Sequence, residues 1–194
     1  MLIHIQDLKR KNYLDTLQIQ EDLRNQVLKN AEDNHLILVE HDHVYTLGKN
    51  GNSTNVLNKS CEIIQTQRGG DVTYHGPGQL VAYPIINLKK KKIGVKSYVE
   101  MIEKLISNIL FDYGLEPHVP MKETGVWIED RKIASIGIHV SRGVTMHGLA
   151  INVNTDLTYF NNIISCGIEG VKICLLYTSP SPRDSALSRM PSSA

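Results

Sequence analysis

The chain has 194 residues and a formal net charge of +1, from 21 basic and 20 acidic residues. This length suits one globular domain with a sizeable core, and the balanced charge argues against nucleic acid or a membrane as the main partner. No apolar run approaches the ~20 residues that a membrane-spanning helix needs, and the N-terminus lacks the basic and apolar blocks of a signal peptide. We therefore expect a soluble protein in the cytoplasm.

Apolar periodicity in the first part of the chain predicts a strand over residues 2–6 and an amphipathic helix over residues 11–31. A second strand is predicted over residues 35–40, with an extended continuation over residues 41–48 and a loop after it. The buried stripe of the helix is expected to contain Tyr13, Leu14, Leu17, Ile19, Leu23, Val27 and Leu28.

The chain contains three cysteines, Cys61, Cys166 and Cys174, whose odd number and spacing fit neither a disulfide framework nor a zinc site. Reduced thiols in a cytosolic compartment fit better. His41 and His43 alternate along the predicted extended segment, so they would share one face of a strand. Because no carboxylate or thiol ligand stands at a fitting distance in the sequence, we predict no metal site there.

A short strand over residues 63–67 is predicted to lead into a glycine-dense segment, residues 68–79. This segment, RGGDVTYHGPGQ, holds four glycines and precedes an apolar, β-prone run over residues 80–88. Because glycine has no Cβ, its backbone can take positive φ or approach a ligand closely. A sharp turn without chemical interest is the alternative, but the polar side chains of the segment favour a ligand-binding loop: Arg68, Asp71, Thr73, His75 and Gln79.

The second half of the chain predicts a helix followed by three strands. Strands over residues 124–128, 132–140 and 144–153 are separated by short turns typical of hairpins. Long helices interrupting hairpin-connected strands favour an α+β domain over repeated βαβ units. The helix covers residues 97–113, with an apolar stripe at Tyr98, Ile102, Leu105, Ile106, Ile109 and Leu110.

Serine and proline become frequent from Ile173 onward, and apolar periodicity disappears. Such a segment buries too little apolar surface to offset the entropy of ordering. We therefore predict a folded domain over residues 1–172 and a disordered or foreign tail over residues 173–194.

Cys166 is a candidate nucleophile, because it follows a polar stretch and immediately precedes a glycine. A cysteine in such a place is as often a small buried hydrophobe, and a nucleophilic thiol needs a nearby cation or base. Lys132 begins a run of small and apolar residues, where a lysine can serve as a base. A lysine at the strand end that points into solvent is the alternative. His139 and His147 are expected at the edge of the core or in a pocket.

Together these segments resemble the lipoyl(octanoyl) transferase family, whose members move an octanoyl group from acyl carrier protein to lysines of lipoate-dependent enzymes. The resemblance implies the fold of biotin and lipoate protein ligases, a mixed sheet backed by helices. Because family members continue with further sequence beyond residue 172, the domain is expected to be incomplete at its C-terminal end. The resemblance rests on residues 39–48, 68–79, 125–128, 132–137, 147–153, 156–157, 160 and 164–168.

The resemblance implies an acyltransferase that uses neither a cofactor nor a metal. The acyl-thioester cysteine of the family falls on Cys166, and its lysine falls on Lys132. The substrate-contacting segments of the family fall on Arg68, Gly69, Gly70, Asp71, Val72, Thr73, Tyr74 and His75, on Ser135, Ile136 and Gly137, and on Gly148, Leu149 and Ala150.

The implied donor is octanoyl-acyl carrier protein, and the implied acceptors are lipoyl domains of 2-oxoacid dehydrogenases and the glycine cleavage H protein, with no nucleic acid or membrane. We hypothesise that the four lysines at residues 89–92 dock an acidic carrier. Two alternatives stay open. One is an ATP-dependent lipoate or biotin protein ligase on the same fold, and the other is a non-catalytic module that binds acyl groups or lipoyl domains.

Overall fold

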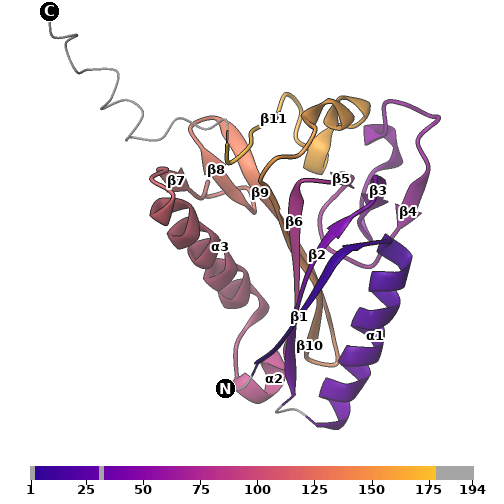
Figure 1. The fold of residues 1–194 in the computed structure, drawn as a ribbon, viewed down its shortest axis with the longest axis vertical. Helices are drawn as coiled ribbons and strands as arrows, with labels where there is room; N and C mark the ends of the chain where they lie inside the picture. Colours follow the sequence, from indigo (N-terminus) through magenta and orange to yellow (C-terminus); the bar gives the residue numbers. More distant parts are fainter. Residues whose placement is uncertain (1–2, 31–32, 178–194) are drawn as a thin grey trace, which may run out of the picture.

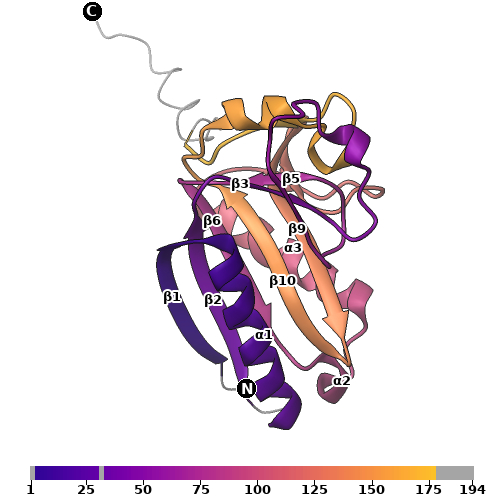
Figure 2. The same cartoon turned by 90° about the vertical axis from the view of Figure 1, so that its right-hand side faces the viewer.

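A mixed β-sheet separates the two long helices of the protein, with α1 (Tyr13–Lys29) on one face and α3 (Val95–Asp112) on the other (Figures 1 and 2). The computed structural model describes residues 3–30 and 33–177. A smaller sheet lies at one end of the main sheet, on the same side as α1 (Figure 1). The predicted α+β architecture of a mixed sheet backed by helices is therefore confirmed.

The remaining elements follow in chain order. They are β1 (Ile3–Lys11), β2 (Asn34–His41), β3 (Val44–Leu47), η1 (Ser53–Asn55), β4 (Ile63–Gln65), β5 (Thr73–His75), β6 (Gln79–Ile85), α2 (Leu88–Lys91), β7 (Pro117–His118), β8 (Val126–Ile128), β9 (Arg131–Ser141), β10 (Val144–Asn152), η2 (Leu157–Asn162), η3 (Ser165–Gly167) and β11 (Lys172–Ile173).

Within the described residues, the main sheet has eight strands in the order β1-β2-β6-β10-β9-β8-β7, with β11 paired to β9, and the smaller sheet has the order β4-β3-β5. In the main sheet β1 pairs with β2, and β11 with β9, in parallel, whereas the other neighbours are antiparallel. Every residue of β10 is buried, because the two helices and the segments around them cover both faces of the sheet there. The β9–β10 hairpin is thus the centre of the fold.

Helix α1 begins after Asn12, whose side-chain oxygen accepts a hydrogen bond from the backbone N–H of Leu14 at 2.8 Å. The predicted stripe was partly wrong, since Leu14 is 54% exposed. Two polar residues, Thr16 and Gln20, are buried against the sheet instead. The N-terminal half of α1 therefore presents polar groups to the interior. The buried residues of α1 are Tyr13, Thr16, Gln20, Leu23 and Val27.

Helix α3 packs on the opposite face of the sheet. Leu105 and Ile109, which were predicted in its buried stripe, are exposed, so the buried stripe is narrower than expected. No helix in the described ranges has both the length and the hydropathy needed to span a bilayer. The side chains of α3 that enter the apolar core between helix and sheet are Tyr98, Ile102, Ile106 and Leu110.

Several local predictions differ from the structure. The glycine-dense segment contains a strand, β5, and β1 extends to Lys11 instead of ending at residue 6. His41 ends β2 and His43 lies in the turn before β3, so the two rings do not share one strand face as predicted. His41 Nδ1 hydrogen-bonds to the backbone oxygen of Lys11 at 2.9 Å, whereas His43 Nδ1 lies 2.7 Å from the Tyr74 hydroxyl.

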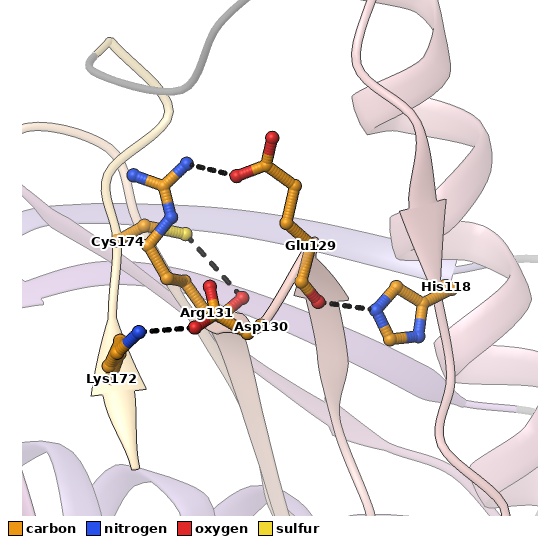
Figure 3. Close-up of polar contacts among 6 residues, drawn as sticks. All are labelled: His118, Glu129, Asp130, Arg131, Lys172 and Cys174. Atoms are coloured by element: carbon orange, nitrogen blue, oxygen red, sulfur yellow. Dashed lines mark hydrogen bonds and ion pairs between the residues drawn. The ribbon is translucent and has the colours of Figure 1, made fainter.

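The C-terminal segment of the described chain is anchored to the β8–β9 turn (Figure 3). Lys172 forms an ion pair with Asp130, and the Cys174 thiol donates to the Arg131 carbonyl at 3.7 Å. Ile173 pairs with Lys132, and Cys174 is buried. The tail prediction was therefore wrong for residues 173–176, which contact the domain. Residues 178–194 lie outside the described residues.

Two neighbouring apolar residues of α3 give a test of this packing. Replacing Ile106, which is 1% exposed, with alanine removes core contacts, and we expect it to lower the free energy of unfolding by about 2–5 kcal/mol. Leu105 is 55% exposed, so Leu105→Ala is expected to change the same quantity by less than about 0.5 kcal/mol. Urea denaturation followed by circular dichroism measures both, and equal losses in the two variants would contradict the orientation of α3.

Candidate active site

The thiol of Cys166 and the amine of Lys132 meet at one end of the central hairpin. Lys132 Nζ donates to Cys166 Sγ at 3.4 Å, and the hydroxyl oxygen of Ser135 lies 3.7 Å from the same sulfur. Lys132 and Ser135 both come from β9, whereas Cys166 lies in η3, 34 residues after Lys132. The structure therefore brings together the two residues expected to carry chemistry.

Lys132 is buried, contrary to the alternative of a solvent-facing lysine at a strand end. It is 3% exposed, and its Nζ lies 5.7 Å from the centre of the Trp127 ring. Among the described residues it forms no ion pair with a carboxylate. Gly125 makes room for it, because a Cβ at that position would stand 2.6 Å from Lys132 Cε.

The turn that carries Cys166 is held against the glycine-dense segment. The backbone N–H of Cys166 donates to the Val72 carbonyl at 2.9 Å. Cys166 itself has φ +58°, the left-handed region that few residues other than glycine adopt. The next residue, Gly167, also has a positive φ, and a Cβ there would meet an Asp71 carboxylate oxygen at 2.9 Å. Contacts from outside the turn thus keep the cysteine in an unfavourable backbone conformation.

A cavity of about 260 Å³ opens beside the Cys166 thiol. An apolar cavity of about 150 Å³ holds benzene, with its six carbons. On that scale, this one has room for about ten non-hydrogen atoms. Its floor is the face of the sheet that α1 covers. The predicted residues that line it are Arg68, Gly70, Asp71, Thr73, His75, Lys132, Ser135, Ile136, Gly137, Gly148, Leu149, Ala150 and Cys166.

Three predicted substrate-contacting residues do not line this cavity: Gly69, Val72 and Tyr74. Side chains alternate between the two sides of an extended segment, so Thr73 and His75 face the cavity while their neighbours face away. Val72 and Tyr74 are completely buried in a separate apolar cluster beneath the smaller sheet. The structure therefore gives these two side chains a role in packing.

Arg68 is buried beside the cavity without a carboxylate ion-pair partner among the described residues. Its Nη2 donates to the Thr46 carbonyl at 2.7 Å, and its Nη1 donates to the Gly69 carbonyl at 3.0 Å. Burial lowers the pKa of Arg68, and the nearby Tyr13 and Cys166 act in the opposite direction. Arg68 and Lys132 thus place two basic side chains at this end of the cavity.

His75 and His147 are neutral side chains on the cavity wall, because burial lowers the pKa of each to about 3. Gln79 fixes the orientation of His75. Its Nε2 donates to the Asn152 side chain at 2.9 Å, so its Oε1 is the atom that accepts from His75 Nδ1 at 2.6 Å. His75 Nε2 consequently carries no proton and can accept a hydrogen bond.

Several cavity residues were missed from the sequence or left without a role. Tyr13 comes from the first turn of α1. The sequence signal that could have revealed it as a cavity residue is that the residues following it on the same helix face, Thr16 and Gln20, are polar. Tyr83 donates its hydroxyl to His41 Nε2 at 2.8 Å, because His41 Nδ1 is already the donor to a backbone carbonyl. The residues missed are Tyr13, Val81, Tyr83, Lys122, Glu123, Thr124 and Ile168, and His147 was expected only at a core edge or pocket.

Helix α2, which begins the four-lysine run of residues 89–92, lies at the opposite end of the sheet from the segment of residues 157–173 that contains η3 (Figure 1). Lys89 packs against Gly143 in the β9–β10 turn, whereas Cys166 contacts Lys132 at the start of β9. Ser141 stands nine positions after Lys132 along the strand, which corresponds to roughly 30 Å. A carrier docked on these lysines would be remote from the thiol, so the structure argues against the docking hypothesis.

A sequence model described as the lipoyl protein ligase A/B catalytic domain matches residues 12–174. The chain belongs to this family. The matched range contains Lys132, Cys166 and the whole glycine-dense segment, and it ends within the C-terminal segment that pairs with β9.

Curated relatives of this family member are octanoyltransferases. The octanoyltransferase of Solibacter usitatus is 47% identical over 171 residues, which cover 84% of this chain and 78% of that protein. The octanoyltransferase of Flavobacterium johnsoniae is 42% identical over 191 residues, which cover 87% of this chain and 82% of that protein.

Solved structures of lipoate protein ligases share the fold. Lipoate-protein ligase A bound with ATP gives a TM-score of 0.76 at 14% identity, covering 97% of this chain and 82% of that chain. A putative lipoate protein ligase from T. acidophilum with bound lipoic acid gives 0.72 at 15% identity, covering 97% and 83%. These identities establish the fold alone, and they confirm the predicted ligase-like architecture.

The buried histidines predict a loss of stability in acid. In the unfolded chain His75 takes up a proton below its ordinary pKa of about 6.5, but in the folded protein its pKa is about 3. Stability is therefore lost as the pH falls below about 6.5. Between pH 7 and pH 5 we expect this residue to lower the free energy of unfolding by about 2 kcal/mol.

His75→Asn should reduce that pH-dependent loss by about the same amount, as measured by urea denaturation at both pH values. His118→Asn, at an exposed histidine, serves as the matched control. A His75→Asn variant that loses as much stability between pH 7 and pH 5 as the parent would contradict the neutral, buried state of this ring.

Gly125 provides a test of the contact between Lys132 and Cys166. Gly125 has φ +130°, and a Cβ there would lie 2.6 Å from both Lys132 Cε and the Ala134 carbonyl oxygen, so alanine should displace the amine from Cys166. We expect alkylation of Cys166 by iodoacetamide at pH 7 to slow by roughly tenfold, because the thiol loses the neighbouring amine that activates it. Mass spectrometry of the Cys166 peptide measures the rate. Gly94→Ala is the control, since no atom lies within 4 Å of a Cβ there, and equal rates in both variants would exclude this role of Gly125.

Proposed function

We propose that this protein transfers an octanoyl group from octanoyl-acyl carrier protein to a lysine of a lipoyl domain, through a thioester on Cys166. The observation that carries the proposal is the 3.4 Å contact between Lys132 Nζ and Cys166 Sγ, both of which line a cavity whose volume is large enough for an eight-carbon chain. The octanoyltransferases among the curated relatives support the acyl group and the reaction class.

In the first half of the reaction, Lys132 takes the thiol proton and the Cys166 thiolate attacks the carbonyl carbon of the donor thioester. A new carbon–sulfur bond forms, the carbon–sulfur bond to the carrier breaks, and the departing thiolate takes the proton from Lys132. One thioester replaces another, so the exchange is nearly balanced in energy and requires no ATP.

In the second half, the amine of the acceptor lysine attacks the Cys166 thioester. Lys132 removes a proton from the attacking amine and returns it to the Cys166 sulfur as the amide forms. The developing oxyanion requires hydrogen-bond donors that are already oriented. Gly70 supplies a candidate, because it lines the cavity and its N–H makes no backbone hydrogen bond within the described residues.

The acyl chain contributes binding energy through the cavity. At about 0.8 kcal/mol for each buried methylene, an octanoyl chain gains about 5 kcal/mol. Discrimination between neighbouring lengths is weaker, at about 1–3 kcal/mol for each methylene, so chains one carbon longer or shorter are expected to react slowly but measurably.

The proposed acceptors are the lipoyl domains of 2-oxoacid dehydrogenases and the glycine cleavage H protein, and the proposed compartment is the cytoplasm. All three cysteines lie within the described residues and none is in a disulfide, which is compatible with a reducing compartment. An ATP-dependent ligase on this fold would not require Cys166. The partly buried contact between the Cys166 thiol and Lys132 therefore favours the transferase.

Covalent loading of the thiol tests the proposal. Incubation with octanoyl-acyl carrier protein, without ATP, should add one octanoyl group to the protein, as measured by intact mass, and Cys166→Ala should remove the adduct. Lys132→Met should slow its formation by roughly 100-fold or more, because general base catalysis is lost.

Cys61→Ala and Lys104→Met, at positions outside the cavity, serve as matched controls. An adduct that persists in Cys166→Ala would place the acyl group elsewhere. Transfer to a lipoyl domain that requires ATP would favour the ligase, and binding of octanoyl-acyl carrier protein without any adduct or transfer would favour the non-catalytic module.

A further inference from the structure

The buried face of α3 contains one acidic side chain, Glu103, among aliphatic and aromatic residues. Glu103 is 8% exposed and forms no ion pair within the described residues. Its Oε1 accepts a hydrogen bond from the backbone N–H of Gly125 at 3.0 Å. Because a carboxyl group is costly to bury unless a partner satisfies it, its place in an otherwise apolar stripe indicates a role beyond packing.

The pairing of β8 with β9 is irregular beside Gly125. Its register shifts between Val126 and Trp127, and the extra residue falls on β9 directly after Lys132. A bulge interrupts the ladder of hydrogen bonds and redirects the side chains beside it, so strand pairing alone constrains the backbone less here. The hydrogen bond from Gly125 to Glu103 supplies a fixed point at this place from outside the sheet.

The backbone of Gly125 shapes the place of the Lys132 amine. A Cβ on Gly125 would lie 2.6 Å from Lys132 Cε and 3.2 Å from Lys132 Nζ, so the lysine side chain lies against this residue. Through the hydrogen bond to Gly125, Glu103 Oε1 is no more than about 9 Å from Lys132 Nζ. A displacement of Gly125 therefore reaches the amine that donates to Cys166 Sγ at 3.4 Å.

Glu103 acts on the site from the far side of the sheet. It does not line the cavity, whereas Lys122, Glu123 and Thr124, which lead to Gly125, do line it. Helix α3 covers the face of the sheet opposite to that of α1 and the cavity (Figures 1 and 2). Glu103 therefore influences the reactive pair through Gly125, without touching a bound acyl group.

We propose that Glu103 is a positioning residue for the reactive pair: by holding the N–H of Gly125, it fixes the backbone that keeps the Lys132 amine against the Cys166 thiol. The proposal rests on the acyl transfer proposed above, in which Lys132 is the base. It requires an acceptor oxygen at this place and does not require a negative charge. A glutamine amide oxygen can accept the same hydrogen bond, whereas aspartate keeps the charge on a side chain that is one methylene too short.

Alkylation of Cys166 by iodoacetamide at pH 7 tests this positioning without an acyl substrate. We expect Glu103→Met to react roughly tenfold more slowly than the parent and Glu103→Gln to react within about twofold of it, because glutamine alone leaves the activating amine in place. Mass spectrometry of the Cys166 peptide measures the rates, on protein that circular dichroism shows to be folded. Glu100→Met, the same substitution at an exposed position of α3, is the matched control.

A double variant separates positioning from a general disturbance of the site. Alkylation should already be slow in Lys132→Met, and adding Glu103→Met should slow it by less than about twofold more, because a residue that acts through the amine has no effect once the amine is absent. Loading of Cys166 from octanoyl-acyl carrier protein gives a second readout. In Glu103→Met its kcat should fall by roughly tenfold while its KM stays within about twofold, because the binding cavity is unchanged.

Equal alkylation rates in Glu103→Met and the parent, or a Glu103→Gln variant as slow as Glu103→Met, would overturn the positioning role. Unchanged alkylation in Lys132→Met, or a further loss of roughly tenfold in the double variant, would also overturn it. If Glu103→Met does not fold, Glu103→Asp decides: a rate roughly tenfold below the parent's supports the role, and an equal rate excludes it. A parent that takes up no octanoyl group refutes the proposed transfer, whereas alkylation still decides the role of Glu103.

Discussion

The contact between the Lys132 amine and the Cys166 thiol is the constraint on which the rest of the site depends. An amine buried this deeply is costly to charge unless an anion stands beside it, and the sulfur 3.4 Å away is the group that can become that anion. The surrounding chain maintains the pair: Gly125 leaves room for the lysine, and the Val72 carbonyl holds the cysteine backbone. Contacts that stabilise the fold here therefore also set the reactivity of the thiol.

The two faces of the main sheet are used differently. On the face covered by α3, Ile106, Leu110 and their neighbours form a continuous apolar core. On the face covered by α1, the apolar packing around Leu23 and Val27 ends where the N-terminal half of the helix begins. Polar side chains and the cavity lie against the sheet there. One face thus supplies much of the hydrophobic stabilisation, which lets the other carry unpaired polar atoms and strained backbone.

The sequence predicted the helices, the central hairpin and the α+β class, because their periodicities are long and regular. No spacing places Lys132 beside Cys166, since 34 residues separate them. The local context nominated Lys132 as the base for this thiol, and the family resemblance then supported the pair. The periodicity of α1 predicts Tyr13 as a core residue of the buried stripe. Periodicity considers only hydrophobicity, so it does not distinguish a core residue from one that lines a partly polar cavity. The sequence analysis also ended the folded domain too early. Strand β11 has two residues, Lys172 and Ile173, and a strand this short leaves no periodic signal.

The pairing of β11 with β9 links the C-terminal segment to the centre of the site. Ile173 lies opposite Lys132, and the Cys174 N–H donates to the Lys132 carbonyl at 3.0 Å. A tag, linker or surface attachment placed just after residue 177 would therefore pull on the strand that positions the reactive amine. The start of β1 lies at the far end of the molecule from this segment (Figure 1). Immobilisation or fluorescent labelling through that end leaves the reactive pair undisturbed.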